Sequence, residues 1–348
     1  MVVVERESVP GYHTTGRSAA TFTESYGPLA VRRLASASRA FFMDPPEGFA
    51  EHPLTAHRGL LFPARADQTA SLEAAHAELL AGGDTVARLE AEAVCEMVPV
   101  IRPDYVTAAL HVPGARDIDV AALHQGFLRA ARGAGAAVLS DAEVTAIARE
   151  NGRWRVATKA GEVTARVLID AAGAWADAVA GLAGVAPVGL EPKRRTALTI
   201  EAPEGLDVAA WPLVIDIDEQ FYFKPEAGRL LVSPADETPM PPCDVQPDEL
   251  DVARAIDRLM RATTIEVRRV LRRWAGLRSF VPDHLPVIGW DTEAPGFFWL
   301  AGQGGVGIMT APAAGRLVAA LALDRALPDD LLSAGVEATA FAPARLRG

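Results

Sequence analysis

Cysteine is scarce in this sequence, and the common metal-binding patterns are missing from it. Only two cysteines occur, Cys95 and Cys243, which lie far apart and have no CxxC motif or histidine-rich neighbours. They cannot form a zinc site alone, and we interpret them as spectator thiols in a reducing compartment. The sequence therefore argues against a disulfide scaffold and predicts a cytoplasmic protein without a metal ion.

Long hydrophobic runs are also missing. Charged side chains begin at residues 5–7, which is too early for the apolar region of a signal peptide. The most apolar stretch, residues 306–323, contains Pro312 and Arg316. We predict a buried helix there and no membrane span.

Lysine is rare as well. Only three of the 34 basic residues are lysines, namely Lys159, Lys193 and Lys224. We attribute the excess of arginine to a GC-rich coding sequence, so an arginine indicates function only where its neighbours are unusual. The formal net charge of −11 argues against nucleic acids and anionic membranes as partners, because both require a basic surface.

The remaining composition is that of an ordinary globular protein. The chain has 348 residues, of which 50% are hydrophobic and 23% are charged. This composition excludes a disordered or collagen-like chain. The length predicts about two domains, with a core large enough to need no disulfide or structural metal.

Strand patterns that lead into helices through glycine turns occur at the start, middle and end of the chain. Residues 2–4 form a short apolar run that predicts a buried parallel strand. Residues 166–170 lead through Gly173 into a helix, and residues 297–300 lead through the turn 302–307 into another. Further helices are expected over 28–42, 119–132 and 248–262, and short strands over 138–139, 144–147, 154–158, 163–169 and 273–280.

Between residues 194 and 233 the pattern changes to short strands separated by turns, which indicates an antiparallel sheet. The predicted fold class is therefore α/β with two domains. Residues 1–45, 115–190 and 271–348 are expected to form a discontinuous nucleotide-binding domain. Residues 46–114 and 191–270 are expected to form an inserted second domain with a mixed, largely antiparallel sheet.

Glu5 follows the first predicted strand. An acidic residue at this place can accept hydrogen bonds from the ribose of an adenine dinucleotide, although one glutamate is a weak indication. The glycine-rich fingerprint that should precede such a strand is not in the printed sequence. We expect that the sequence begins inside the second strand of this unit, as a truncated gene model would.

Two loops are candidates for contact with a cofactor. The loop 13–20 offers hydroxyls, backbone amides and Arg17 to a pyrophosphate or a planar ring; an ordinary surface turn is the alternative. The loop 302–307 holds four glycines directly before a helix, so its backbone and the helix amides can approach an anionic ring. A tight strand-to-helix turn is the alternative there.

Several side chains are candidates for the substrate. Arg278, just before the glycine loop, could hold a carboxylate through two N–H groups. The run Lys193-Arg194-Arg195, at the start of the antiparallel region, could supply a second cation. Tyr222 and Tyr26 could add phenolic donors. A solvated charge or a core aromatic side chain would also explain each of them.

Together and in this order, these segments resemble the amino-acid oxidase family of FAD enzymes, which includes D-amino-acid dehydrogenases, glycine oxidase and sarcosine oxidase. The resemblance covers essentially the whole chain and is carried by residues 2–6, 15–20, 171–175, 276–280, 286–289 and 302–307. Within the family, the sequence is most similar to the bacterial D-arginine dehydrogenases, through stretches such as 38–42 and 192–195.

The resemblance implies a Rossmann-like FAD-binding domain, an α+β substrate domain and non-covalent FAD. It implies that Glu5, Arg6 and Val144 lie at the adenosine end of the cofactor. The residues that it implies along the pyrophosphate and the flavin are Thr15, Gly16, Arg17, Ser18, Ala19, Thr21, Gly173, Gly304, Gly305, Val306, Gly307, Ile308 and Met309. At the substrate it implies that Arg195 and Arg278 hold the carboxylate, that Tyr222 and Tyr26 close the pocket, and that the Gly305 carbonyl accepts a hydrogen bond from the amine.

Two positions depart from the D-arginine dehydrogenase pattern. Leu60 replaces a glutamate that pairs with the cationic end of arginine, and Thr21 replaces a pocket histidine. A buried guanidinium without a partner is strongly disfavoured. We therefore expect Leu60 and Thr21 to direct the specificity toward neutral, apolar D-amino acids.

The expected reaction removes two electrons from the Cα–N bond of a D-amino acid, with hydride transfer from Cα to flavin N5. The imino acid then hydrolyses to a 2-oxo acid and ammonia, and a quinone or O2 accepts the electrons. One alternative is a glycine- or sarcosine-type amine oxidase that uses O2, and another is a truncated, non-catalytic flavin-fold protein. A nicotinamide dehydrogenase is disfavoured because the loops 13–20 and 302–307 would have no evident function in it.

Overall fold

Two of the parallel strand pairs lie in small sheets of the computed structural model, which describes residues 1–347. In the first, β1 (Val2–Val4) pairs in parallel with β8 (Ala137–Leu139). In the second, β12 (Leu168–Asp170) pairs in parallel with β20 (Phe297–Ala301), and β19 (Val287–Trp290) joins β20 antiparallel. The chain therefore returns to parallel pairing at its start, middle and end, as expected.

The prediction that residues 2–4 form a buried strand is correct about the strand and wrong about burial. Val2 is 42% exposed and Val3 is 37% exposed. Among the described residues, β1 has only β8 as a partner, so one edge of β1 is left unpaired. The expected strand over 163–169 is also wrong, because it divides into β11 (Gly161–Ala165) and β12, which belong to different sheets.

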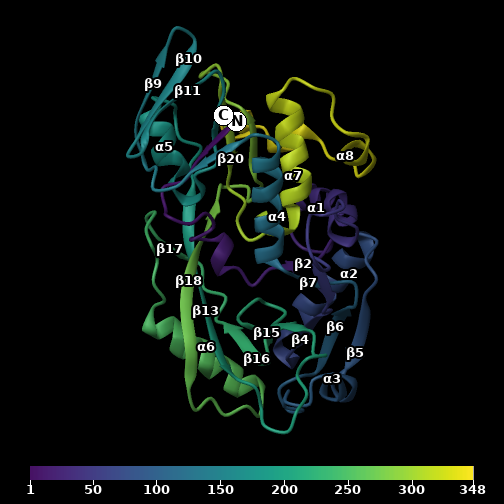
Figure 1. Ribbon diagram of the computed structural model, residues 1–348. Helices are drawn as coiled ribbons and strands as arrows, with labels where there is room; N and C mark the ends of the chain where they lie inside the picture. The colour runs from purple at the N-terminus through teal and green to yellow at the C-terminus, as the bar shows by residue number, and fades with distance from the viewer. Residues whose placement is uncertain (348) are drawn as a thin grey trace.

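Helices surround these sheets in the upper part of the molecule (Figure 1). They are α1 (Leu29–Met43), α4 (Val120–Gly133), α5 (Ala176–Leu182), α7 (Gly307–Ala322) and α8 (Asp329–Ser333). The predicted N-cap of α4 is confirmed, since the Asp119 carboxylate accepts a hydrogen bond from the Ala122 amide at 2.8 Å. The apolar stretch that contains Pro312 is confirmed as the buried helix α7.

A nine-stranded sheet occupies the lower part of Figure 1. Its path runs β17 (Thr238–Pro239), β13 (Glu191–Glu201), β16 (Arg229–Ser233), β15 (Tyr222–Glu226), β14 (Leu213–Ile215), β4 (Leu60–Ala64), β6 (Ala108–Val112) and β5 (Ala87–Glu90). β18 (Val270–Phe280) pairs with the other edge of β13. Only β14 and β4 are parallel, so the expected mixed, largely antiparallel sheet is confirmed.

Three helices pack with this sheet: α2 (Thr69–Ala81), α3 (Ala91–Met97) and α6 (Glu249–Ala262). Two smaller sheets complete the strands, one of β9 (Val144–Glu150), β10 (Arg153–Thr158) and β11, the other of β2 (Thr21–Phe22), β3 (Thr55–His57) and β7 (Arg116–Ile118). Among the described residues, no helix combines the length and the apolar character that a membrane crossing needs.

The long strands β13 and β18 run from the lower sheet up to the helices and small sheets, as Figure 1 shows. Each strand has eleven residues, and ten pairs join them, from Glu191 opposite Phe280 to Ile200 opposite Val270. The domain boundary that we expected at residue 270 falls at the start of β18. This pair of strands therefore carries the chain between the two parts, and the candidate site is built on it.

Candidate functional site

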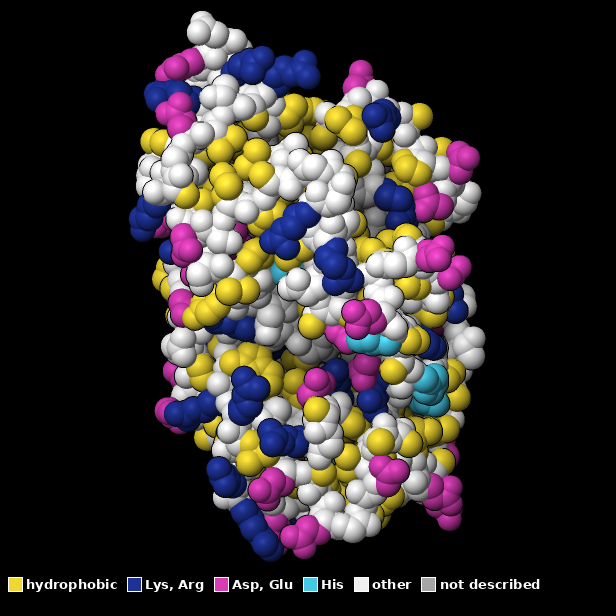
Figure 2. Space-filling model, in the orientation of Figure 1, with side chains coloured by type: hydrophobic (Ala, Val, Ile, Leu, Met, Phe, Trp, Pro, Cys, Tyr) yellow, Lys and Arg dark blue, Asp and Glu magenta, His cyan; other side chains and the backbone are white. Residues whose placement is uncertain are grey.

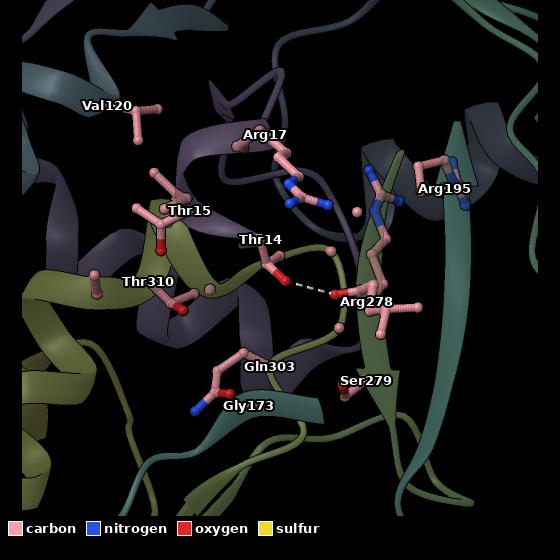
Figure 3. Close-up of a pocket in the computed structure, with 18 of the residues that line it drawn as sticks. Thr14, Thr15, Arg17, Val120, Gly173, Arg195, Arg278, Ser279, Gln303 and Thr310 are labelled. Carbon is pink, nitrogen blue, oxygen red and sulfur yellow. Dashed lines mark hydrogen bonds between the residues drawn. The ribbon is translucent and has the colours of Figure 1, made fainter. Parts of the chain in front are cut away.

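The register of β13 and β18 places three cationic side chains on one face. Arg195 lies opposite Gly276, and Lys193 lies opposite Arg278. Residues opposite each other in an antiparallel pair share a face, and diagonal neighbours are about 7–8 Å apart, within reach of long side chains. Arg195 and Arg278 are such diagonal neighbours, and both line the same cavity, in which Figure 3 labels them.

Two loops are hydrogen-bonded to the edge of β18 that does not pair with β13. Thr14 Oγ1 donates a hydrogen bond to the Leu277 carbonyl at 2.8 Å, which fixes the loop 13–20 (Figure 3). The Gly304 amide donates to the Ser279 carbonyl at 2.9 Å, which fixes the loop 302–307. The two loops that the sequence suggested for a cofactor are therefore held next to each other by one strand.

The glycine loop lets Arg278 pass close to the backbone. A Cβ at Gly305 would lie 2.9 Å from Arg278 Nη1, so a side chain there would collide with the guanidinium. Gly302 and Gly304 have φ angles of +70° and +50°, which favour glycine. The loop then opens α7, whose N-terminus has no side-chain cap, so its first amides remain free to donate.

A cavity of about 460 Å³ lies between these loops, α4, α7 and the two strands. Twelve of the residues proposed from the sequence line it: Thr15, Arg17, Ser18, Ala19, Gly173, Arg195, Tyr222, Arg278, Gly304, Gly305, Gly307 and Ile308. Nine do not line it: Glu5, Arg6, Gly16, Thr21, Tyr26, Leu60, Val144, Val306 and Met309. The structure therefore brings together most of the residues expected at the flavin and both arginines expected at the substrate carboxylate.

The residues expected at the adenosine end gather elsewhere. The Glu5 carboxylate, at the carboxyl end of β1, accepts a hydrogen bond from the Glu7 amide at 2.9 Å. Arg6 lies over the ring of Trp175, 4.9 Å from its centroid, and 3.6 Å from Glu143, the residue before Val144. Glu5, Arg6 and Val144 thus lie close to one another, outside the cavity lining.

Arg17 has a full set of protein partners. Its Nη1 donates to the carbonyls of Val245 and Ala275 at 3.1 Å and 3.0 Å, and its Nη2 lies 2.5 Å from Asp244 Oδ1. The guanidinium thereby ties the loop 13–20 to β18 and to residues 244–245. A cofactor could therefore contact only the backbone and the aliphatic carbons of Arg17.

Gly16 and Leu60 are also explained by packing. A Cβ at Gly16 would lie 2.5 Å from the Gly11 carbonyl oxygen, which accepts the Gly16 amide at 2.7 Å, so the turn requires glycine. Leu60 is 3% exposed and belongs to an apolar cluster against which Tyr222 packs. Leu60 is therefore buried in this cluster and does not line the cavity.

Tyr26 packs against an apolar cluster that includes Val306 and Met309, and charged groups act on its phenol. Burial raises the pKa of its phenol, and the carboxylates of Glu219 and Glu237 act in the same direction. Arg278 and Arg195 act in the opposite direction on this pKa. Tyr26 is thus electrostatically close to both arginines, although it is not part of the cavity lining.

The two arginines differ in their partners. Arg195 Nη2 donates to Glu237 Oε1 at 2.7 Å, and the Arg195 side chain is only 9% exposed. The Nε of Arg195 is buried and has no hydrogen-bond partner. The Arg278 side chain, by contrast, makes no ion pair or hydrogen bond with the rest of residues 1–347, although it lines the cavity. Arg278 is therefore available to bind an anion.

Some lining residues were not among the sequence candidates. His124 on α4 packs against Gly11, and burial lowers the pKa of its imidazole. Gln303 and Thr310 flank the N-terminus of α7. Gln303 sits inside the glycine loop and could have been found there, whereas Thr310 is recognisable only once α7 is placed.

Asp170 is the buried acidic residue nearest the cavity along the chain, directly before the lining residue Ala171. Its Oδ1 accepts the Ala172 amide at 3.1 Å, while its Oδ2 has no partner. Burial raises the pKa of Asp170 to about 7. No group of three or more potential metal ligands occurs in the part of the chain that the structure describes, and Cys95 and Cys243 are both free thiols.

Charged side chains of both signs are interspersed over the face shown in Figure 2.

Comparisons with known proteins agree with this geometry. A family model described as FAD dependent oxidoreductase (DAO) matches residues 1–321. The chain is 26% identical over 243 residues to glycine oxidase of Geobacillus kaustophilus, covering 69% of this chain and 62% of that protein. It is 27% identical over 265 residues to mitochondrial dimethylglycine dehydrogenase of Mus musculus, covering 70% of this chain and 30% of that protein.

Solved structures share the fold. Glycine oxidase of G. kaustophilus superposes with a TM-score of 0.81 at 22% identity, over 93% of this chain and 88% of that chain. L-alpha-glycerophosphate oxidase of Mycoplasma pneumoniae, with FAD bound, gives a TM-score of 0.81 at 19% identity, over 92% and 88%.

The chain therefore belongs to the DAO family of FAD-dependent oxidoreductases, and FAD is the cofactor of that family. It spans less than two thirds of the length of the two relatives named by sequence. Those relatives support the family, and not the narrower similarity to D-arginine dehydrogenases.

Proposed function

We propose that this protein oxidises the Cα–N bond of D-amino acids with neutral, apolar side chains, using non-covalently bound FAD. The observation that carries the proposal is the unpaired guanidinium of Arg278, which lies in the cavity against the Gly305 backbone. An arginine without a carboxylate partner in a half-buried site is well suited to a substrate carboxylate. The proposal is further supported by the relatives, which are named for oxidations of amines and amino acids.

The residues present suit the flavin end of FAD. The N-terminus of α7 is uncapped, and the glycines before it leave the backbone open toward the cavity. Free helix amides favour a negative charge, such as a reduced flavin carries. Asp170 lies directly before the lining residue Ala171, and its buried Oδ2 has no hydrogen-bond partner among the described residues.

In the proposed mechanism, the residues of this chain bind the substrate and orient it. Arg278 holds the substrate carboxylate, and Arg195 adds a second contact through its remaining N–H groups. Tyr222 and the Gly305 carbonyl, which both line the cavity, limit the positions of Cα and of the amine. Such positioning supplies a large part of the catalytic effect. FAD, when bound, would accept the hydride that leaves Cα, while the C–N bond becomes the C=N bond of the imino acid. Water then converts the imino acid to a 2-oxo acid and ammonia.

Leu60 and Thr21 support the preference for neutral side chains. Leu60 lies in the apolar cluster behind Tyr222, and it offers no charge to a cationic substrate. Thr21 is also uncharged, and its buried hydroxyl has no hydrogen-bond partner among the described residues. A guanidinium or ammonium group that reached this cluster would remain unpaired.

A glycine- or sarcosine-type amine oxidase is the second candidate. The glycine oxidase and the dimethylglycine dehydrogenase among the relatives favour it. Both candidates need the same carboxylate anchor, and they differ in the space required beyond Cα and in the electron acceptor.

The test is the rate at which bound flavin loses its visible absorbance when purified protein is mixed anaerobically with a substrate. D-leucine and D-methionine should reduce the flavin faster than D-arginine, glycine or sarcosine. Faster reduction by glycine or sarcosine, with hydrogen peroxide formed in air, would establish the second candidate. Protein that binds no flavin, or whose flavin no amine reduces, would refute both and leave the non-catalytic alternative.

A further inference from the structure

The cationic face of β13 and β18 carries more positive charge than one carboxylate needs. Lys193, Arg195 and Arg278 share this face by register. Lys193 Nζ lies 3.4 Å from Glu191 Oε2 and 3.8 Å from Glu237 Oε2. Arg195 is paired with Glu237 at 2.7 Å. Two carboxylates therefore accompany two of the cations, and Arg278 alone remains without an anionic partner.

The backbone fixes Glu237 in this position. β17 pairs with residues 193–194 of β13, so Glu237, the residue before β17, lies at the next step of the ladder, opposite Arg195. The preceding residue, Asp236, accepts the Thr196 amide at 2.6 Å and the Thr196 hydroxyl at 2.9 Å. The segment is thus attached to β13 on both sides of Glu237. The Glu237 side chain is 42% exposed, and the pairing of its backbone segment with β13 holds it beside Arg195.

We propose that Glu237 is a specificity-determining residue, which neutralises Arg195 and so limits the site to substrates with one carboxylate. This inference rests on the proposed function, because it assumes that Arg278 holds the substrate carboxylate. A second carboxylate on the substrate would meet Glu237 instead of a free guanidinium, and like charges repel. Removing the Glu237 charge would free the Arg195 N–H group that now donates to Glu237, so that it could bind that second carboxylate.

Glu237 also positions Arg195. The buried Nε of Arg195 has no hydrogen-bond partner, so Glu237 supplies the one hydrogen bond through which the guanidinium is held. Glutamine at position 237 keeps the size of the side chain and one hydrogen-bond acceptor, while it removes the charge. The substitution E237Q therefore separates the effect of charge from the effect of position.

The experiment compares the binding of acetate and malonate by isothermal titration calorimetry, in FAD-containing wild-type protein and in E237Q. These probes differ by one carboxylate. We expect E237Q to bind malonate at least about tenfold more tightly than the wild type, with acetate affinity changed much less. A shift of the visible flavin spectrum on addition of malonate should report binding at the cofactor, independently of turnover.

The matched control is E191Q, because Glu191 pairs with Lys193 on the same face and does not contact Arg195. This variant removes the same charge and should leave the ratio of malonate to acetate affinity at the wild-type value. The double variant E237Q/R195Q should lose the gain in malonate affinity. Equal gains in E191Q and E237Q would show a general charge effect and overturn the proposal, as would unchanged malonate affinity in E237Q.

The two proposals fail in different ways. If no amine reduces the flavin, the proposed function fails, while selective malonate binding by E237Q would still show that Glu237 controls the charge of the site. If D-leucine reduces the flavin but E237Q leaves malonate binding unchanged, only the role of Glu237 is wrong. Glutamate-like substrates would then be excluded by some other feature.

Discussion

Gly276 on β18 lies directly opposite Arg195 on β13, so a residue without a side chain faces a buried guanidinium. This pairing leaves open space in front of Arg195, and the cavity extends into it. A Cβ at Gly276 would lie 3.6 Å from Arg17 Cβ, which is an ordinary contact distance. Small substitutions at this position should therefore fit the protein and still fill part of the site.

The substitution G276V tests this arrangement. The branched side chain should project into the cavity, and we expect the KM for the amino acid to rise at least about tenfold, because misplacement of the substrate is costly. Thermal melting should change little, since no backbone atom blocks the new Cβ. The smaller G276A should have an intermediate effect on KM. A KM in G276V equal to that of the wild type would show that the substrate does not use this space.

Arg278 is predicted to anchor the carboxylate. In R278Q the charge and the paired N–H donors are lost, so we expect KM to rise about 100-fold, in line with about 3 kcal/mol for a charge-assisted contact. Stability should hardly change, because Arg278 has no protein partner within residues 1–347. The exposed Arg272 on the same strand provides the control R272Q. Similar KM values for both variants would contradict the assignment.

Arg17 is predicted to be structural. In R17M the hydrogen bonds to the Val245 and Ala275 carbonyls are lost, and we expect the free energy of unfolding to fall by about 3 kcal/mol in urea titrations. D244N should cost much less, because Asp244 is half-exposed and both carbonyl contacts remain. If D244N destabilises the protein as much as R17M, the ion pair and not the carbonyl contacts fixes the loop.

Asp170 predicts a dependence of stability on pH. Its pKa is raised by burial from 3.8 to about 7, so the folded protein holds a proton that the unfolded chain releases between these values. Stability is therefore lost as the pH rises from about 4 to about 7, by up to about 4 kcal/mol. D170N removes this cost and should stabilise the protein at pH 8, with the difference vanishing near pH 4. Thermal melting of both proteins across this pH range measures it, and an equal difference at all pH values would contradict the assignment.

Much of the fold could be predicted because local signals and tertiary contacts agree. The N-cap Asp119 and the glycine turn before α7 mark helices that the structure contains. The short strands separated by turns over 194–233 predicted the antiparallel sheet that the structure contains. The burial of Val2 and Val3 could not be predicted from their apolar character, because burial depends on neighbouring strands and only β8 is present among the described residues.

The site was predictable in its residue types and less so in its contacts. Arg195, Arg278 and the glycine loop do meet at one cavity. The partner of Arg195 could not be foreseen, because Glu237 is distant in sequence and reaches Arg195 only through the pairing of β17 with β13. The same is true of Arg17, whose carbonyl partners belong to segments more than 200 residues away.

Both loops that border the cavity, and the strand that carries Arg195, are fastened to β18. A displacement of this strand would consequently disturb flavin retention and carboxylate affinity at once. Heating or denaturant should thus abolish flavin binding and carboxylate binding in a single step, with no intermediate that retains the flavin but no longer binds a carboxylate.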